Sequence, residues 1–184
     1  MDMKKRQLRQ KCNSKRAQVW VETVIYTLIG LTIMGALIAV ITPKVNMMLD
    51  QSAISQSFES LNRINSQISD SLYSAGNQRA VSLMIKKGEY VINPAENSIY
   101  FFLKNTNYLA SQLNEVTPQG ELTILTTERT SKKYDIKVEL KLNSLNLTYQ
   151  DTKLSKTLTN SPTAYNLIIR YAGGSDKKLN IDSI

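Results

Sequence analysis

The sequence contains no histidine and only one cysteine, Cys12. Without histidine, the chain lacks the commonest general base and metal ligand. A single cysteine can form no internal disulfide in any compartment. Serine and threonine are plentiful, but none lies in a nucleophile-elbow pattern, and no paired carboxylates stand at short spacing. We therefore expect no catalytic residues, no metal site, no cofactor and no enzymatic activity.

Excess charge is scarce outside the first seventeen residues. The chain has a formal net charge of +8, and residues 1–17, with seven Lys or Arg and one Asp, account for +6 of it. The remaining balance of +2 is too even to build a groove for phosphates, so we expect no nucleic-acid partner. The Gly173-Gly174 pair follows no strand-to-helix phosphate pattern and predicts a turn.

A long uncharged apolar run follows the basic residues. Residues 23–42 contain no charge, and 20 residues of helix at about 1.5 Å each cover roughly 30 Å, the thickness of a hydrocarbon core. Because the Lys/Arg cluster precedes this run, the positive-inside rule predicts a single-pass membrane protein with a cytoplasmic N-terminus and an external domain after Pro43. A cleaved secretory signal is disfavoured, since the run exceeds 7 to 15 residues. An ordinary membrane anchor leaves the acid Glu22 unexplained.

The residues that precede the run form a recognisable junction. Ala17-Gln18-Val19-Trp20-Val21-Glu22 resembles the processing site of archaeal type IV pilin-like proteins with a class III prepilin signal. In that family a basic leader ends in a small residue, and the mature chain begins with Gln and has Glu at its fifth position. Trp20 stands where the family often has Ser.

The resemblance implies that a prepilin peptidase cuts between Ala17 and Gln18 on the cytoplasmic side and that the apolar helix is retained. It also implies assembly by an ATPase and a membrane platform protein into a helical homopolymer. The chain would then divide into a cleaved leader (1–17), a transmembrane or filament-core helix (18–42), an amphipathic stalk helix (43–76) and an extracellular β domain (77–184). Before assembly, membrane lipid would surround the helix.

Glu22 lies one helical turn after Gln18. Cleavage would create an ammonium at Gln18, and residues four apart share a helix face. A carboxylate among apolar helices is tolerable when it is paired with that ammonium, in its own chain or in a neighbour, so pairing would set the register of subunits. Alternatively, Glu22 lies at the headgroup level of the membrane, with Trp20 as an interfacial anchor.

The pattern beyond the apolar run predicts a helix followed by strands. Pro43 predicts a kink or break. Apolar residues then recur at helical spacing, and Gly76-Asn77 predicts the helix end; the apolar positions are Ile54, Phe58, Leu61, Ile64, Ile68 and Leu72. After Gly76 the period becomes two, which predicts strands. We expect strands over 81–85, 89–92 and 99–103 as a three-stranded meander, then over 134–142, 145–149, 165–171 and 179–181, with a tight turn at Asn143-Ser144. The expected fold is α+β, a long N-terminal helix packed on a C-terminal antiparallel β domain, as in type IV pilins.

Asn146-Leu147-Thr148 is the one Asn-x-Ser/Thr sequon without proline at x, which predicts N-glycosylation at Asn146.

Taken together, the features of the sequence favour a structural subunit of an extracellular type IV pilus-like filament. Two other functions fit the same residues. One is a single-pass anchored protein whose β domain binds a partner at the cell surface, and the other is a minor pilin or pseudopilin of a secretion machine.

Overall fold

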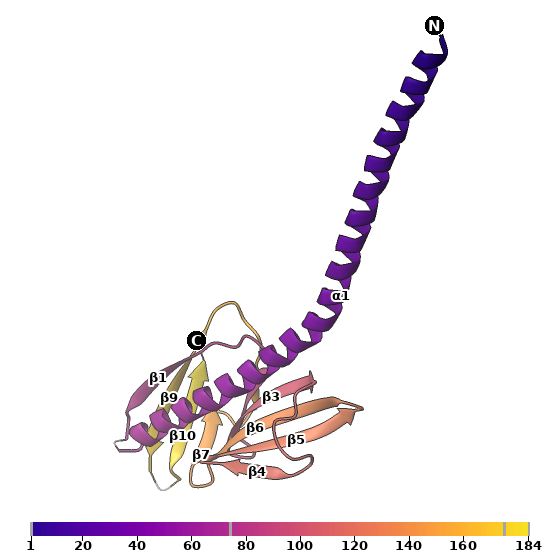
Figure 1. Ribbon diagram of the computed structural model, residues 1–184. Coiled ribbons are helices and arrows are strands. Elements are labelled where there is room, and N and C mark those ends of the chain that lie inside the picture. The colour runs from indigo at the N-terminus through magenta and orange to yellow at the C-terminus, as the bar shows by residue number, and fades with distance from the viewer. Residues whose placement is uncertain (1, 74, 175, 184) are drawn as a thin grey trace. The chain divides into compact units, whose positions relative to one another are not determined.

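The computed structural model describes residues 2–73, 75–174 and 176–183, with side chains from Val19 onward. It consists of α1 (Asp2–Ser71) followed by strands, and it divides into two compact units, Met1–Asn46 and Met47–Ile184. The strands are β1 (Gln78–Leu83), β2 (Glu89–Asn93), β3 (Ser98–Thr106), β4 (Val116–Gln119), β5 (Leu122–Thr130), β6 (Lys133–Lys141), β7 (Asn146–Tyr149), β8 (Lys156–Leu158), β9 (Tyr165–Gly173) and β10 (Lys178–Ser183). An N-terminal apolar helix and a C-terminal β domain make this an α+β fold (Figure 1).

The amphipathic stripe predicted in the second half of α1 is confirmed. Ile54, Leu61, Ile64 and Ile68 are each at most 4% exposed, and Phe58 is half-buried. The prediction is wrong for Leu72, which is 38% exposed because it lies just past the end of the helix. The helix ends at Ser71, before Gly76, and the Ser71 hydroxyl donates 2.7 Å to the Ile68 carbonyl. Gly76 has a φ of 85° in the connection to β1, so its left-handed conformation serves this turn.

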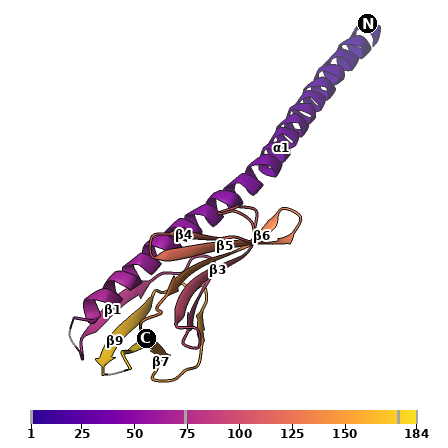
Figure 2. The same cartoon turned by 90° about the horizontal axis from the view of Figure 1, so that it is seen from below.

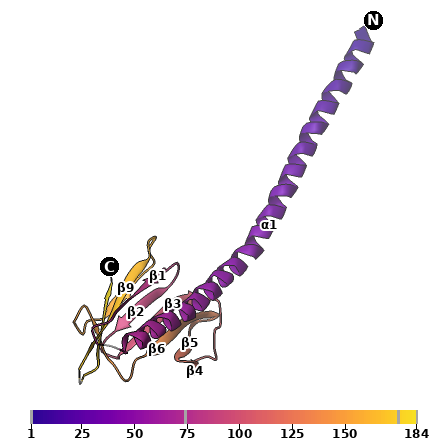
Figure 3. The ribbon, with the colours of Figure 1, turned by 90° about the vertical axis from the view of Figure 1, so that its left-hand side faces the viewer.

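The strands form two sheets. A four-stranded sheet has the order β1-β9-β10-β7, and a six-stranded sheet has the order β4-β5-β6-β3-β2-β8. Figures 2 and 3 show strands of both sheets beside the second half of α1. Neighbouring strands are antiparallel except for β7 and β10, which are parallel.

Two sequence predictions about pairing are wrong. The strand β1 does not join β2 and β3 in a meander, because it pairs with β9, with Val81 opposite Leu167. The strand β7 does not pair with β6 across the predicted turn at Asn143-Ser144, because it pairs with β10 in the other sheet, and Leu147 is opposite Leu179. The hairpin of β2 and β3 is confirmed, with Ile92 opposite Ile99. Local periodicity identified these strands but could not identify their non-local partners.

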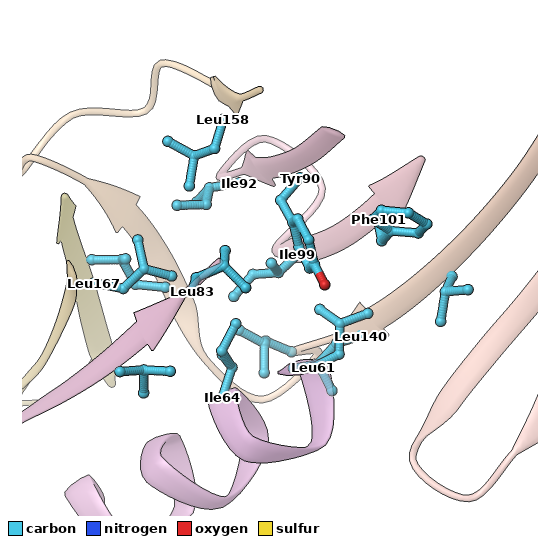
Figure 4. Packing of buried hydrophobic residues seen from close by; sticks show 14 of the residues in the cluster. Leu61, Ile64, Leu83, Tyr90, Ile92, Ile99, Phe101, Leu140, Leu158 and Leu167 are labelled. Carbon is cyan, nitrogen blue, oxygen red and sulfur yellow. The ribbon is translucent and has the colours of Figure 1, made fainter. Parts of the chain in front are cut away.

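One hydrophobic core joins the helix to both sheets. Leu61 and Ile64 of α1 point toward the side chains of the sheets in Figure 4, among them Leu83 and Leu140. These four side chains are at most 2% exposed. Full burial of such a side chain stabilises the folded state by about 1.5–3 kcal/mol, so this core, rather than intrinsic helix propensity, holds the second half of α1 in place.

Candidate assembly helix

The first unit consists of helix whose described side chains are not covered by the rest of the chain. Every residue from Val19 to Asn46 is exposed, including the aromatic residues Trp20 (70%) and Tyr26 (71%). A helix that is apolar on all sides is stable when something else surrounds it, either lipid or protein. The helix is long and apolar enough to cross a membrane, so it is a candidate membrane anchor.

Threonine hydroxyls within this helix are satisfied internally. Thr23, Thr27, Thr32 and Thr42 each donate to the carbonyl four residues earlier, at 2.7–2.9 Å. These bonds leave no free hydroxyl donor at those positions. A polar side chain that bonds its own backbone costs less in an apolar environment than an unsatisfied one. The threonines are therefore compatible with lipid or with packed helices.

Glu22 is the one carboxylate among residues 19–46, and such bonding does not satisfy it. Its side chain is exposed, and it forms no ion pair with any side chain described from Val19 onward. Ala17 and Gln18 lie within the backbone of α1, so Gln18 and Glu22 are four residues apart in helix. The side chains of Ala17 and Gln18 lie outside the described residues, and the processing site stays a prediction.

Pro43 does not interrupt the helix. Pro43 lies inside α1, and the helix continues on both sides of it, so the structure has no break there. The predicted kink at Pro43 stays a prediction.

A β-carbon added to Gly30 or Gly35 would meet nothing within 4 Å. The chain itself therefore does not use these two glycines for close packing.

Asn146, the predicted glycosylation site, lies at the start of β7. Its side chain is half-buried and its carbonyl oxygen accepts a hydrogen bond from the Lys153 ammonium. The sequon hydroxyl of Thr148 is 4% exposed and donates to the Leu179 carbonyl at 3.2 Å and to the Asn180 side chain at 3.0 Å. The folded domain thus occupies the hydroxyl that forms part of the sequon.

A buried acid near the start of the second unit was not anticipated from the sequence. Asp50 is 4% exposed and interacts with Thr106 and Lys87. The available signal was its position four residues before Ile54, which extends the buried stripe by one turn. An acid at that position is ordinarily read as the solvated end of a stripe.

No family model matches the chain, and neither a curated protein nor a solved structure does. Among the described residues, no group of three His, Cys, Asp or Glu side chains could hold a metal ion.

Proposed function

We propose that this chain is a structural subunit of an extracellular type IV pilus-like filament, assembled from a membrane-inserted and leader-cleaved precursor through the helix that contains Glu22. The observation that carries the proposal is the state of this helix. Residues 19–46 are exposed on all sides and predominantly apolar; they hold one carboxylate, Glu22, near their start, and Lys44 lies near the opposite end. Such a helix needs surroundings that are apolar and that also supply a cation.

Cleavage before Gln18 would supply the cation. The new terminal ammonium would stand one helical turn from Glu22 or be presented by a neighbouring subunit. A correctly placed subunit then neutralises the carboxylate, whereas a misplaced one leaves a charge unpaired among apolar side chains. This difference gives the assembly a defined register. A membrane-embedded prepilin peptidase, an assembly ATPase and a platform protein would be its partners.

The exposed threonine and glycine positions support the same proposal. The Thr27 and Thr32 hydroxyls donate to carbonyls of their own helix. The helix can therefore move from lipid into a bundle of helices without any change in these hydrogen bonds. Open space at Gly30 and Gly35 allows another helix to approach closely. Under this proposal the β domain lies outside the cell and coats the filament surface.

A permanently anchored, single-pass surface protein is the second candidate. Trp20, 70% exposed and close to Glu22, favours it because tryptophan and a nearby charge are typical of membrane interfaces. Under this alternative, Glu22 faces headgroups and has no role in assembly. Removal of the Glu22 charge should therefore impair assembly under the first candidate and have no such effect under the second.

The test compares Glu22→Gln with the wild type in cells that supply the peptidase, ATPase and platform. We expect Glu22→Gln to be inserted and cleaved as in the wild type but to lose most of the sedimenting filament fraction. Glu59→Gln is the matched control, since Glu59 is an exposed acid in the same helix, and filaments should persist. Normal filaments from Glu22→Gln would remove the pairing argument, and a wild type found only as detergent-soluble monomer would favour the anchored protein.

A further inference from the structure

Asp50 marks the point at which α1 begins to pack on the β domain. All residues from Met47 to Leu49 are exposed, and Asp50 is the first buried residue of the helix in the second unit. The next buried positions are Ile54 and Ser57, so Asp50 begins the buried stripe. A carboxylate at this position is unusual, because a charged side chain is rarely fully buried without partners.

Two partners from separate segments reach the Asp50 carboxylate. The Thr106 hydroxyl, at the end of β3, donates to Asp50 Oδ2 at 2.6 Å. The Lys87 ammonium, from the connection between β1 and β2, forms an ion pair with Oδ1. Oδ2 is thus hydrogen-bonded, while Oδ1 has the ion pair but no hydrogen bond from the described residues. A single helix position contacts both the end of β3 and the connection between the two sheets. The Thr106 hydroxyl also accepts a hydrogen bond of 2.9 Å from the Tyr108 backbone N–H, which fixes its orientation.

Without the polar contacts of Asp50, few apolar contacts would hold this end of the packed helix. Before Ile54 the stripe has only the half-buried Ala53, and the preceding residues Met47 to Leu49 are exposed. The opposite end is secured differently, because the connection after Ser71 is bound where the Gly76 N–H donates 2.8 Å to the Tyr171 carbonyl. Helix segments with few buried contacts open locally far more often than the core does. The Asp50 end therefore needs a contact of its own.

We propose that Asp50, with Lys87 and Thr106, forms an exit lock that fixes where α1 leaves the β domain. Asp50 is a positioning residue in this lock. With the lock intact, packing begins at Asp50 in every molecule, and the free part of the helix has one defined length. Without it, the first packed turn opens back toward Ser57. The inference does not depend on filament formation, because an anchored surface protein would use the same lock.

Amide hydrogen exchange of the full chain in detergent micelles tests the lock. In Asp50→Ala we expect exchange over residues 50–57 to accelerate about tenfold or more, while exchange over 61–71 and in β9 keeps its wild-type rate. Glu59→Ala is the matched control, an exposed acid on the same helix, and it should change neither region. Unchanged exchange over 50–57 in Asp50→Ala would overturn the proposal. Equal acceleration in every core segment would do the same, because it would show a general loss of stability.

Milder variants keep the test decisive if Asp50→Ala does not fold. Thr106→Val keeps the shape of the side chain and removes its hydroxyl, and Lys87→Met keeps the apolar stem and removes the ammonium. Each should accelerate exchange over 50–57 and leave 61–71 unchanged. The double variant Asp50→Asn with Lys87→Met should accelerate exchange by less than the product of the two single effects. The lock would be contradicted if the double variant accelerated exchange by the full product of the two single effects. It would also be contradicted if Thr106→Val produced no acceleration over residues 50–57.

Discussion

Gly88 stands directly against the ring of Phe101. A β-carbon added to Gly88 would lie 2.5 Å from two ring atoms of Phe101 and 3.0 Å from the Phe102 carbonyl oxygen. Gly88 also has a φ of 81°, in the left-handed region that favours glycine. Phe101 is 1% exposed and packs against Tyr90 with ring centroids 5.1 Å apart. The backbone of the turn before β2 thus packs directly against a buried side chain of the core.

Gly88→Ala should therefore destabilise the protein more than an ordinary glycine substitution. We expect a loss of about 2–4 kcal/mol, from left-handed backbone strain together with overpacking against the buried Phe101 ring. Gly120→Ala is the control, since Gly120 has a φ of 64° but nothing within 4 Å of the added carbon; it should lose only about 1–2 kcal/mol. Denaturant unfolding of both variants measures the difference. Equal losses would show that Phe101 accommodates the methyl group.

Tyr90 should make stability fall at alkaline pH. Burial raises the pKa of its hydroxyl to about 12, and a hydrogen bond with Ser60 acts in the opposite direction. Because the pKa is higher in the folded state than the ordinary value near 10, the stabilisation is complete below pH 10 and is lost as the pH rises toward 12. The loss amounts to about 2–3 kcal/mol.

Unfolding free energies at pH 9 and pH 12 check this expectation. Tyr90→Phe should lose less stability between the two values than the wild type does. Tyr73→Phe, at a side chain that is 89% exposed, should follow the wild-type curve. Parallel curves for Tyr90→Phe and the wild type would show that Tyr90 ionises without linkage to folding.

The sequence predicted local periodicity better than pairing. The stripe through Ile54, Leu61 and Ile68 was correct because burial on one helix face imposes a spacing that the sequence displays directly. Three strands, β4, β5 and β8, were missed. Threonines alternate with Leu122 and Ile124 in β5 and lower its apolar contrast, while β4 and β8 have only four and three residues. The partners of β1 and β7 lie far away in sequence, where no local pattern reports them.

The candidate site was predictable in part. Glu22 and the apolar run were identified because a charge in a membrane-length segment stands out in any sequence. Asp50 was not identified, because its burial depends on Thr106, 56 residues away, and on Lys87. An acid at the end of an apolar stripe looks the same in sequence whether it is solvated or locked. Only the tertiary contacts of the folded domain distinguish the two.

Replacing Ala17 by a bulky residue should trap the precursor. The processing-site hypothesis requires a small residue before the cut, so Ala17→Phe should leave residues 1–17 attached. Intact-mass measurement of the membrane fraction checks this directly. Ala39→Phe, a comparable change at an exposed position further along the same helix, should leave cleavage unaffected. A correctly cleaved Ala17→Phe protein would remove the proposed cut.

A glycan at Asn146 should be added before β10 joins the sheet. The Thr148 hydroxyl donates to Leu179 and Asn180 of β10 and is buried once that strand has paired with β7. We expect the peptide that contains Asn146, from protein made in its own cells, to carry a glycan mass. The same peptide should stay unmodified when folded, unglycosylated protein is treated with the glycosylation enzymes. An unmodified mass in the cellular protein would end the hypothesis.

The most direct measurement is the N-terminal sequence of cell-surface material that sediments as filaments and contains this chain. The proposed function predicts that Gln18 is the first residue and that residues 19–46 are retained, because cleavage must create the ammonium that pairs with Glu22. An intact leader, in a protein that stays a detergent-soluble monomer, would contradict the account.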